Sequence, residues 1–180
     1  MPFNSEYTDD VIRLCDERFG KNYITKSDLK SFINHGAKFT LALDEDKKLL
    51  ALSMSYITDM GYASRYLSIS AQEIKDVQGG DFPIGIIKFI VVARSAERLG
   101  LAHKLMDLEI ENMKKGGAKF IWASLWKKGN VIPAKKIVED YGFKYFKTVH
   151  NRLEDNHKYV CNFCHNVPCR CDDAIYYKMV

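Results

Sequence analysis

Hydrophobic and polar residues follow two different periods along this chain, and each change of period marks the boundary of a predicted element. Apolar residues spaced three or four apart predict amphipathic helices, whereas short runs of β-branched and aromatic residues predict strands. The predicted helices cover residues 7–19, 25–35, 101–115 and 131–141. The predicted strands cover residues 37–43, 49–57, 85–92, 119–126, 143–153 and 174–180.

Local signals at the ends of the elements support these boundaries. Thr8 is expected to cap the first helix, and Thr25 with Asp28 approximates a capping box at the start of the second. The charged turn 44–48 joins the first two strands, so we expect an antiparallel hairpin there. Gly116 ends the third helix.

Residues 59–84 form an insertion between the hairpin and the next strand, since a direct connection would need only a few residues. A capping box formed by Ser70 and Glu73 predicts a short helix over residues 70–77. The polar and aromatic side chains of the insertion either line a substrate pocket or pack a surface loop, and we favour the surface loop. These side chains belong to Tyr62, Arg65, Tyr66 and Asp81.

The order of these elements predicts one mixed α/β domain that spans residues 1–180. Its central sheet is expected to be mostly antiparallel, with helices on both faces. A length of 180 residues is sufficient for one sizeable hydrophobic core and short for two. The sequence contains no internal repeat and no low-complexity tract.

Composition excludes several classes of protein. Hydrophobic residues make up 47% of the chain and charged residues 28%, which is typical of a soluble domain. No apolar run approaches the roughly 20 residues that cross a bilayer, and the first residues lack a signal-peptide pattern, so we expect a cytoplasmic protein without membrane contact. The net charge of +4 suits an anionic ligand, but the basic residues are too scattered to indicate nucleic acid.

The stretch from Phe89 to Lys104 is predicted to combine a buried strand, a tight turn and the start of a helix. Gly100 and Ala102 leave the backbone uncovered where the helix begins, so its first N–H groups and the positive end of its dipole point outward. This arrangement favours a phosphate-bearing ligand. It is not a P-loop, because no Gly-Lys-Ser/Thr follows, and it lacks the three spaced glycines of a dinucleotide fingerprint.

The turn formed by residues 97–102 resembles the acyl-CoA-binding turn of the GNAT superfamily of N-acyltransferases. In that turn Gln or Arg is followed by two residues, Gly, one residue, and then Gly or Ala. Gly100 and Ala102 match the pattern, and Glu97 departs from it. The resemblance covers most of the chain, because the order of elements also matches apart from a missing or very short first strand. Further landmarks of the family are matched by Asn130, Ala134 and Tyr141-Gly142-Phe143.

The resemblance implies an acetyl-CoA-dependent N-acetyltransferase with a GNAT-like fold. Backbone N–H groups of the turn would hold the CoA pyrophosphate, and the backbone of Ile90 and Val92 would bind the pantetheine arm between two parallel strands. Asn130 would contact the same cofactor, and a loop or capping role is its open alternative. Glu97 is expected to point away from the phosphates, with Arg98 supplying positive charge. The complete set implied for the cofactor is Ile90, Val91, Val92, Glu97, Arg98, Leu99, Gly100, Leu101, Ala102 and Asn130.

The implied reaction is direct attack of a neutral amine on the thioester carbonyl, which needs an oxyanion donor and a base, with an acid for the leaving thiolate. A backbone N–H of strand 85–92 is the expected oxyanion donor. Val138 occupies the position at which many members of the superfamily carry a tyrosine acid. Other candidates have structural roles that explain them as well or better, so we assign no catalytic side chain. These candidates are Tyr141, His150, Asp81 and Glu73.

Four of the five cysteines cluster near the end of the chain, and in a cytoplasmic protein such clustering favours a metal over disulfides. Cys161, Cys164, Cys169 and Cys171 form two close pairs that can close around one tetrahedral zinc ion. A zinc ion with four protein ligands would be structural and would order the cysteine-rich loop 154–173. His165 could replace one thiolate, and free thiols or a labile disulfide are the alternatives.

The predicted function is acetyl transfer from acetyl-CoA to a primary amine of a small molecule or a peptide. The 59–84 insertion and the cysteine-rich loop are the expected sources of acceptor specificity. Two other classes stay open: a non-catalytic acyl-CoA-binding sensor and, less favoured, a zinc-knuckle adaptor that binds nucleic acid. The basic residues that motivate the adaptor are Lys147, Arg152, Lys158 and Arg170. The acceptor, the length of the acyl group and the oligomeric state are left open.

Overall fold

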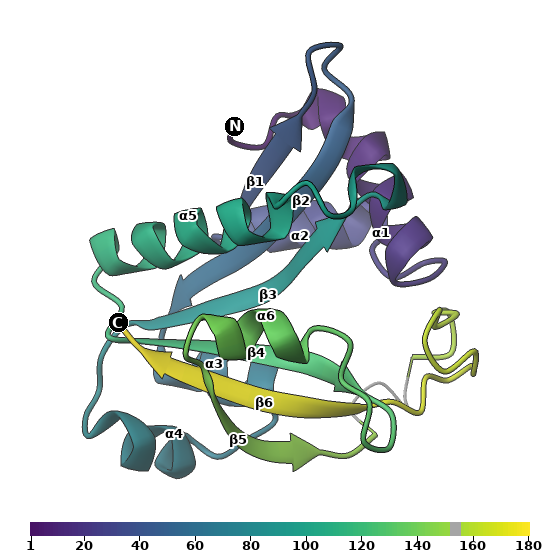
Figure 1. Cartoon of the computed structure of the whole chain (residues 1–180). Helices are drawn as coiled ribbons and strands as arrows, with labels where there is room; N and C mark the ends of the chain where they lie inside the picture. The colour runs from purple at the N-terminus through teal and green to yellow at the C-terminus, as the bar shows by residue number, and fades with distance from the viewer. Residues whose placement is uncertain (152–155) are drawn as a thin grey trace.

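The computed structural model describes residues 1–151 and 156–180 and is built around a six-stranded sheet (Figure 1). The strands are β1 (Lys38–Leu43), β2 (Leu49–Thr58), β3 (Ile84–Val92), β4 (Phe120–Lys127), β5 (Lys144–Val149) and β6 (Asp172–Met179). They lie side by side in the order β1-β2-β3-β4-β6-β5. Every neighbouring pair is antiparallel except β3 and β4, which are parallel. The predicted mixed, mostly antiparallel sheet is confirmed.

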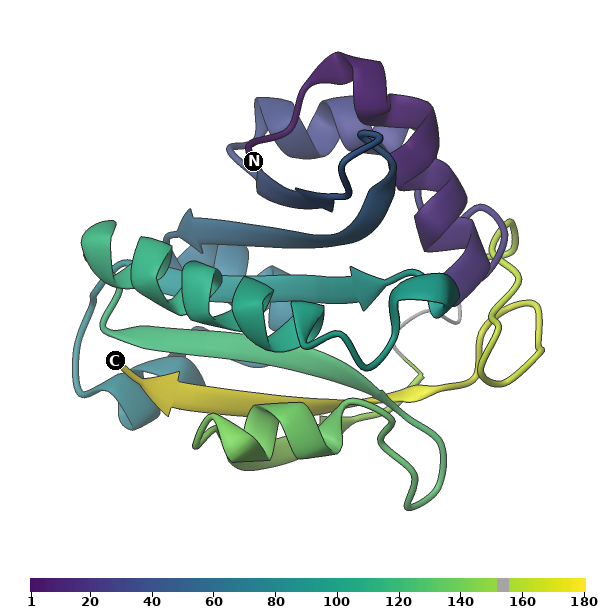
Figure 2. The same cartoon turned by 45° about the horizontal axis from the view of Figure 1, so that its top comes forward.

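Helices cover both faces of this sheet, as predicted. One face is covered by α1 (Thr8–Arg18), α2 (Lys26–Asn34), α3 (Met60–Leu67) and α4 (Ala71–Gln78), whose apolar residues join the larger core. The other is covered by α5 (Leu101–Lys115) and α6 (Lys135–Asp140), where Met106, Met113 and Val138 form a second core with the sheet. Figure 2 shows α5 and α6 together on the near side. Within the described residues, no helix has the length and apolar character needed to cross a membrane.

Most predicted boundaries agree with the structure to within a few residues. The capping boxes at Thr25 and Ser70 form as predicted, and the hairpin of β1 and β2 is antiparallel. The prediction that Thr8 caps α1 is wrong. Thr8 is the first helical residue, and its hydroxyl donates a hydrogen bond to the Ser5 carbonyl oxygen at 2.7 Å.

The helix predicted over residues 131–141 is wrong in its first part. Val131 pairs with Lys128 across a tight turn, and backbone N–H···O hydrogen bonds of 3.0 Å run in both directions. Pro133 follows, which disfavours a helical backbone at Ile132. The α6 helix therefore begins only at Lys135.

The insertion 59–84 holds two helices, of which the sequence predicted only α4. Asp59 caps the additional helix α3 by accepting a hydrogen bond from the Tyr62 N–H at 2.8 Å. The carboxylate of Glu73 accepts a hydrogen bond from Lys147 of β5 at 2.6 Å, and this bond lowers the pKa of Glu73 to about 2. The insertion is therefore attached to the far edge of the sheet.

The strand predicted over residues 143–153 is shorter in the structure. It is present from Lys144 to Val149. Residues 152 and 153 of that prediction, including Arg152, lie outside the described part of the chain.

Candidate functional site

The candidate site lies where the two parallel strands separate. β3 and β4 pair from Ile84 opposite Phe120 to Ile87 opposite Ala123, and beyond that point each strand continues without the other. At the same place the register of β3 against β2 shifts, so that Lys88 is an extra residue in a β-bulge. The bulge and the separation open the middle of the sheet.

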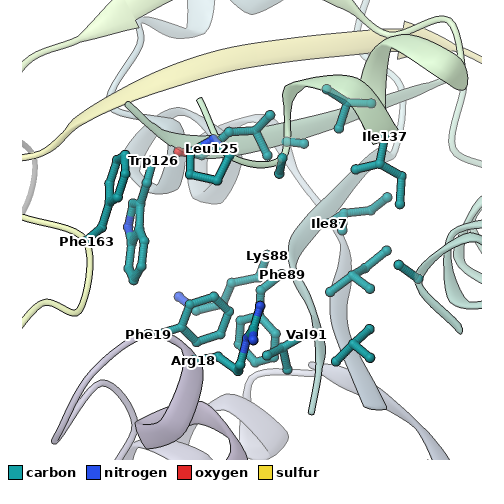
Figure 3. Close-up of a pocket in the computed structure, with 18 of the residues that line it drawn as sticks. Arg18, Phe19, Ile87, Lys88, Phe89, Val91, Leu125, Trp126, Ile137 and Phe163 are labelled. Carbon is teal, nitrogen blue, oxygen red and sulfur yellow. The ribbon is translucent and has the colours of Figure 1, made fainter. Parts of the chain in front are cut away.

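A largely apolar cavity of about 450 Å³ occupies this opening (Figure 3). β3 contributes residues 87–92 and β4 residues 123–126, while α5 and α6 close the side walls. Figure 3 shows Trp126 beside Phe163, with Arg18 and Phe19 at the end of α1 on the other side of the opening.

The backbone of β3 points alternately toward β2 and toward this cavity. The N–H of Ala93 donates a hydrogen bond to the Leu50 carbonyl oxygen at 2.8 Å, on the β2 side. Neighbouring residues of a strand direct their backbone groups to opposite edges, so those of Val92 and Ile90 point to the edge that β4 has left. The structure therefore places Ile90, Val91 and Val92, all named from the sequence, along the cavity.

The turn before α5 presents a helix N-terminus without a side-chain cap. Gly100 is the N-cap residue and has a φ of 74°. It has no side chain that could accept a hydrogen bond from the first N–H groups of the helix. Arg98 has a φ of 65°, a left-handed conformation that costs a non-glycine residue about 1 kcal/mol. Residues 97–100 are exposed, whereas Ala102 lines the cavity. The first N–H groups of α5 thus face a surface next to the cavity, where the helix dipole is positive.

Glu97 is paired with the end of α1. Its carboxylate lies 2.5 Å from the guanidinium of Arg18, and Arg18 also lines the cavity. In addition, the N–H of Arg94 donates a hydrogen bond to the carboxylate of Glu17 at 3.0 Å. Arg18, rather than the exposed Arg98, therefore brings a positive charge to the cavity wall.

Two other residues named from the sequence lie away from the cavity. Asn130 is exposed in the turn between Lys128 and Val131 and is not part of the lining. The hydroxyl of Tyr141 donates to Asp107 at 2.7 Å, and burial together with this bond raises the pKa of Tyr141 to about 12. Tyr141 therefore joins α6 to α5, while Val138 lines the cavity.

The remaining candidate acids and bases are engaged at the surface. His150 is exposed, with its Nδ1 atom 3.0 Å from the carboxylate of Asp172. Asp81 pairs with Lys75 at 3.4 Å. Neither residue lines the cavity.

A second cavity of about 240 Å³ opens toward α2 and α3 and shares lining residues with the first. The shared residues are Tyr23, Lys88, Ser124 and Trp126. The second cavity also has two carboxylates, Asp28 and Asp173. Asp173 is only 5% exposed and accepts a hydrogen bond from the Ser124 hydroxyl at 2.7 Å.

Aromatic rings surround the amine of Lys88 at the junction of the two cavities. Its Nζ atom lies 4.8 Å from the ring centroid of Phe32 and 4.9 Å from that of Tyr66. Tyr62 stacks on Tyr66 with ring centroids 6.4 Å apart. Tyr66 thus lines a cavity, whereas Arg65 of the same helix is exposed. The insertion therefore contributes to a cavity, and use of that cavity by a substrate stays a prediction.

The four clustered cysteines converge on one point. Their Sγ atoms all lie within 4.8 Å of one another, and across residues 1–151 and 156–180 this is the single group that could hold a metal. The Sγ atoms are 3.9 Å apart for Cys161 and Cys171 and 3.7 Å apart for Cys164 and Cys169. Four sulfurs placed tetrahedrally at about 2.3 Å from a zinc ion are about 3.8 Å apart. The donor set therefore fits zinc.

Hydrogen bonds favour the thiolate form of Cys161. The N–H groups of Phe163 and Cys164 point at the Cys161 sulfur at 3.4 and 3.5 Å. A hydrogen bond from Cys169 lowers the pKa of Cys161 to about 4. His165 is exposed and lies outside the group, so the structure favours four cysteine ligands over a set that includes His165.

Comparison with solved structures identifies the fold of this chain, whereas comparison by sequence finds no match. No family model matches the sequence, and no curated protein matches it. The chain aligns with Arabidopsis thaliana NAA60, solved in complex with a bisubstrate analogue, at a TM-score of 0.71 and 13% identity over 99% of this chain and 95% of that one. It aligns with an acetyltransferase assigned to the GNAT family from Desulfovibrio desulfuricans at 0.62 and 14%, over 99% and 96%. This chain has the GNAT acetyltransferase fold.

A further solved structure with the GNAT fold is the NatC complex bound to Gag peptide and CoA. The alignment has a TM-score of 0.70 and 14% identity, and it covers 100% of this chain and 96% of that one. The likeness extends over the whole chain, so the resemblance drawn from the turn and its landmarks is confirmed for the fold.

Several residues of the cavity in this GNAT fold were missed from the sequence. They come from the end of α1, the β3 bulge, the end of β4 and the cysteine loop, which no single motif connects. Trp126 and Phe163 were recognisable only as aromatic residues near turns, and Arg18 and Phe19 only as the end of a helix. The missed residues are Arg18, Phe19, Tyr23, Lys88, Ser124, Trp126, Asn162, Phe163 and Asp173.

Proposed function

We propose that this protein is an acetyl-CoA-dependent N-acetyltransferase. The observation that supports this function best is the separation of β3 and β4 after Ile87 and Ala123, which opens a cavity beside the uncapped N-terminus of α5. Proteins of the same fold were solved with a bisubstrate analogue and with CoA and a peptide, which supports the same classes of ligand here.

The donor would lie along the edge of β3. N–H groups at the start of α5 would bind the pyrophosphate, because an uncapped helix N-terminus attracts anions, and Arg18 would add a positive charge. The backbone groups of Ile90 and Val92 would hydrogen-bond the pantetheine arm. The thioester would then reach the β3 bulge at Lys88, where the two cavities meet. Contact between Asn130 and the donor stays a prediction.

The acceptor would enter through the second cavity. Carboxylates of Asp28 and Asp173 attract an ammonium group, and Asp173 with Ser124 lies at the junction where an amine would lose its proton. The neutral amine attacks the thioester carbon, the C–S bond breaks, and the CoA thiolate takes up a proton. A backbone N–H of β3 next to the bulge would stabilise the oxyanion.

The test combines donor binding with detection of the product. The protein is titrated calorimetrically with acetyl-CoA and then incubated with acetyl-CoA and a panel of primary amines and peptides, with acetylated products identified by mass spectrometry. Asp173→Asn should lower turnover while acetyl-CoA binding persists. Asp172→Asn is the matched control, because Asp172 pairs with His150 outside both cavities. Failure of the native protein to bind acetyl-CoA would overturn the proposal.

Val138 favours a second candidate, a non-catalytic acyl-CoA-binding module. An apolar side chain occupies a place on the cavity wall where many enzymes of this superfamily carry a tyrosine. Acetyl-CoA binding without transfer to any amine of the panel would favour this candidate over the enzyme.

We also propose that Cys161, Cys164, Cys169 and Cys171 hold one structural zinc ion. With all four positions filled by thiolates, the ion would order the loop and would not activate water. Metal analysis should find one zinc per chain, and Cys161→Ser combined with Cys164→Ser should lose it. Cys15→Ser is the control thiol, since Cys15 is buried in α1. Reduced thiols of this kind suit a cytoplasmic location.

The nucleic-acid adaptor has less support. Lys147 is hydrogen-bonded to Glu73, and Arg152 lies outside the described residues. Lys158 and Arg170 are exposed, so this candidate rests on these two of the four basic residues.

A further inference from the structure

The cysteine loop, residues 156–171, is attached to the C-terminal end of α1. Figures 1 and 2 both show the loop beside that end of the helix. The side-chain amide of Asn162 donates hydrogen bonds to the carbonyl oxygens of Asp16 at 3.2 Å and Glu17 at 3.0 Å. Its backbone N–H donates to the carbonyl oxygen of Phe19 at 2.8 Å. One residue of the loop therefore donates to three carbonyl groups at the end of α1, where few backbone donors follow, although that of Asp16 also accepts from the Gly20 N–H.

The turn after α1 is held by the same loop. The Tyr159 hydroxyl donates to the Phe19 carbonyl oxygen at 2.8 Å, and the Val160 N–H donates to the Lys21 carbonyl oxygen at 3.1 Å. In the other direction, the Asn22 side chain donates to the carbonyl oxygen of Lys158 at 3.0 Å. Hydrogen bonds thus join residues 16–22 to residues 158–162 along both segments.

Side chains from both segments form one wall of the large cavity. Phe19 and Tyr23 come from the end of α1 and the following turn, and Phe163 comes from the loop. The ring of Trp126 on β4 packs against two of these rings. Its centroid lies 5.2 Å from that of Phe19 and 5.6 Å from that of Tyr23. Figure 3 shows Phe163 beside Trp126 and across from Phe19. The position of this wall depends on how the loop is held.

The end of α1 also touches the turn proposed to bind the pyrophosphate. Glu17 accepts the N–H of Arg94, and Arg18 pairs with Glu97. The side chain of Asn162 in the cysteine loop donates a hydrogen bond to the backbone carbonyl oxygen of Glu17. The last turn of α1 therefore lies between the cysteine cluster and the donor turn.

We propose that the zinc site anchors this cavity wall, so that zinc binding and substrate binding are linked. The identity of the substrate as acetyl-CoA rests on the proposed function, whereas the anchoring rests on the proposed zinc ion alone. Besides the hydrogen bonds to α1, the loop has a small core of Tyr159 and the four cysteines, so the metal supplies much of its order. Without the ion, the bonds from Asn162 and Tyr159 to α1 would open and the wall would become mobile. Reciprocity requires that acetyl-CoA in turn tightens zinc binding by the same factor.

Hydrogen exchange of the full-length protein tests the anchoring without reference to activity. Zinc-loaded protein is compared with protein from which a chelator has removed the ion. We expect exchange to rise in residues 16–23 as well as in the loop, with the middle of α5 unchanged. Unchanged protection of residues 16–23 after loss of zinc would refute the anchoring.

Calorimetry and zinc affinity test the link to the substrate. Removal of zinc should weaken acetyl-CoA binding by about 5-fold or more, the usual lower range of coupling between sites. Acetyl-CoA should raise the affinity of the protein for zinc by the same factor, measured at equilibrium by competition with a chromogenic chelator. Identical acetyl-CoA affinity with and without zinc would contradict the linkage.

Two asparagines of the loop provide a matched pair of variants. Asn162→Ala should keep its zinc, because Asn162 is not a ligand, yet raise exchange in residues 16–23 and weaken acetyl-CoA binding. Asn166→Ala is the control, because its side chain donates to the carbonyl oxygen of Cys164 at 3.1 Å within the loop. Equal behaviour of the two variants would argue against the proposal. If the native protein binds no acetyl-CoA, the proposed function fails, and hydrogen exchange still decides the anchoring.

Discussion

The proposed donor edge of β3 and the cysteine loop border the same cavity, yet they are stabilised in different ways. The donor edge exists because two long strands separate within a sheet that is packed on both faces. The cysteine loop instead brings four cysteines together from a short stretch and has only a small core of its own. The comparison indicates that the donor edge should tolerate most side-chain changes, whereas the loop should fail as a unit.

Packing around Gly85 illustrates the first kind of stability. A Cβ atom at this position would lie 2.6 Å from the Met113 sulfur and 3.2 Å from Ile121, so β3, β4 and α5 meet there without room for a side chain. Such packing is spread over many residues of the fold. The loop, in contrast, reaches the rest of the molecule mainly through the end of α1.

Gly20, in the turn after α1 against which the cysteine loop packs, is expected to show the largest effect of substitution. A Cβ atom there would lie 1.8 Å from the Val160 carbonyl oxygen, and its φ of +127° is already unfavourable for other residues. Gly20→Ala should therefore destabilise the protein by about 3 kcal/mol or more, because both strain and a backbone clash result. Urea unfolding and zinc content measure the effect.

Gly36→Ala is the control for strain alone. Gly36 has a φ of +83°, and nothing lies within 4 Å of its Cβ position, so about 1 kcal/mol is expected. Equal losses for the two variants would mean that the loop is not held tightly against α1.

Proline substitution in β3 tests the donor edge one N–H group at a time. The N–H of Val92 faces the cavity, so Val92→Pro should leave the pairing with β2 intact and weaken acetyl-CoA binding by about 10-fold through loss of one hydrogen bond. Val91→Pro is the matched variant, because the N–H of Val91 faces β2 and its loss should cost about 3 kcal/mol of stability. Unaltered acetyl-CoA affinity in Val92→Pro would contradict the proposed path of the pantetheine arm.

The same comparison shows what the sequence can reveal. The strand 85–92, the turn at Gly100 and the helix after it were predicted correctly, because burial, glycine and helical periodicity are local signals. The cysteine group was also predicted, since its ligands lie close together in the chain. The cavity wall was not, because Phe19, Trp126 and Phe163 meet only after the sheet and the loop are in place.

Glu97 marks another limit of sequence reasoning. The adjacency of Glu97 and Arg98 led us to expect Arg98 as the positive charge near the phosphates, which stays a prediction. The pairing of Glu97 with Arg18, which is distant in the sequence, could not be predicted. Two helices also differ from the prediction. Pairing of Val131 with Lys128 shortens α6, and α3 forms in a segment for which no helix was predicted.

Charge at the donor turn should have a smaller effect than loss of a backbone donor. Arg18→Gln should weaken acetyl-CoA binding by about 5-fold and reduce its dependence on salt, because a partly exposed charge near phosphates is screened. Glu97→Gln should tighten binding by at most about 3-fold, since Glu97 points toward Arg18 and not toward the phosphates. Calorimetry at two salt concentrations measures both variants, and strong tightening in Glu97→Gln would show that its carboxylate faces the donor.

Tyr141→Phe should have the smallest effect, because Tyr141 lies between α5 and α6 and does not line the cavity. Turnover should stay within about twofold of the native rate, and stability should fall by about 1 kcal/mol through loss of the bond to Asp107. The pKa of Tyr141 is raised from 10.0 to about 12, so its contribution to stability is complete below pH 10 and is lost as the pH rises toward 12. Urea unfolding of both proteins from pH 8 upward should show a constant difference that shrinks above pH 10. A fall in turnover of tenfold or more would instead identify Tyr141 as the acid that protonates the leaving thiolate, and would extend the catalytic machinery to the interface of α5 and α6.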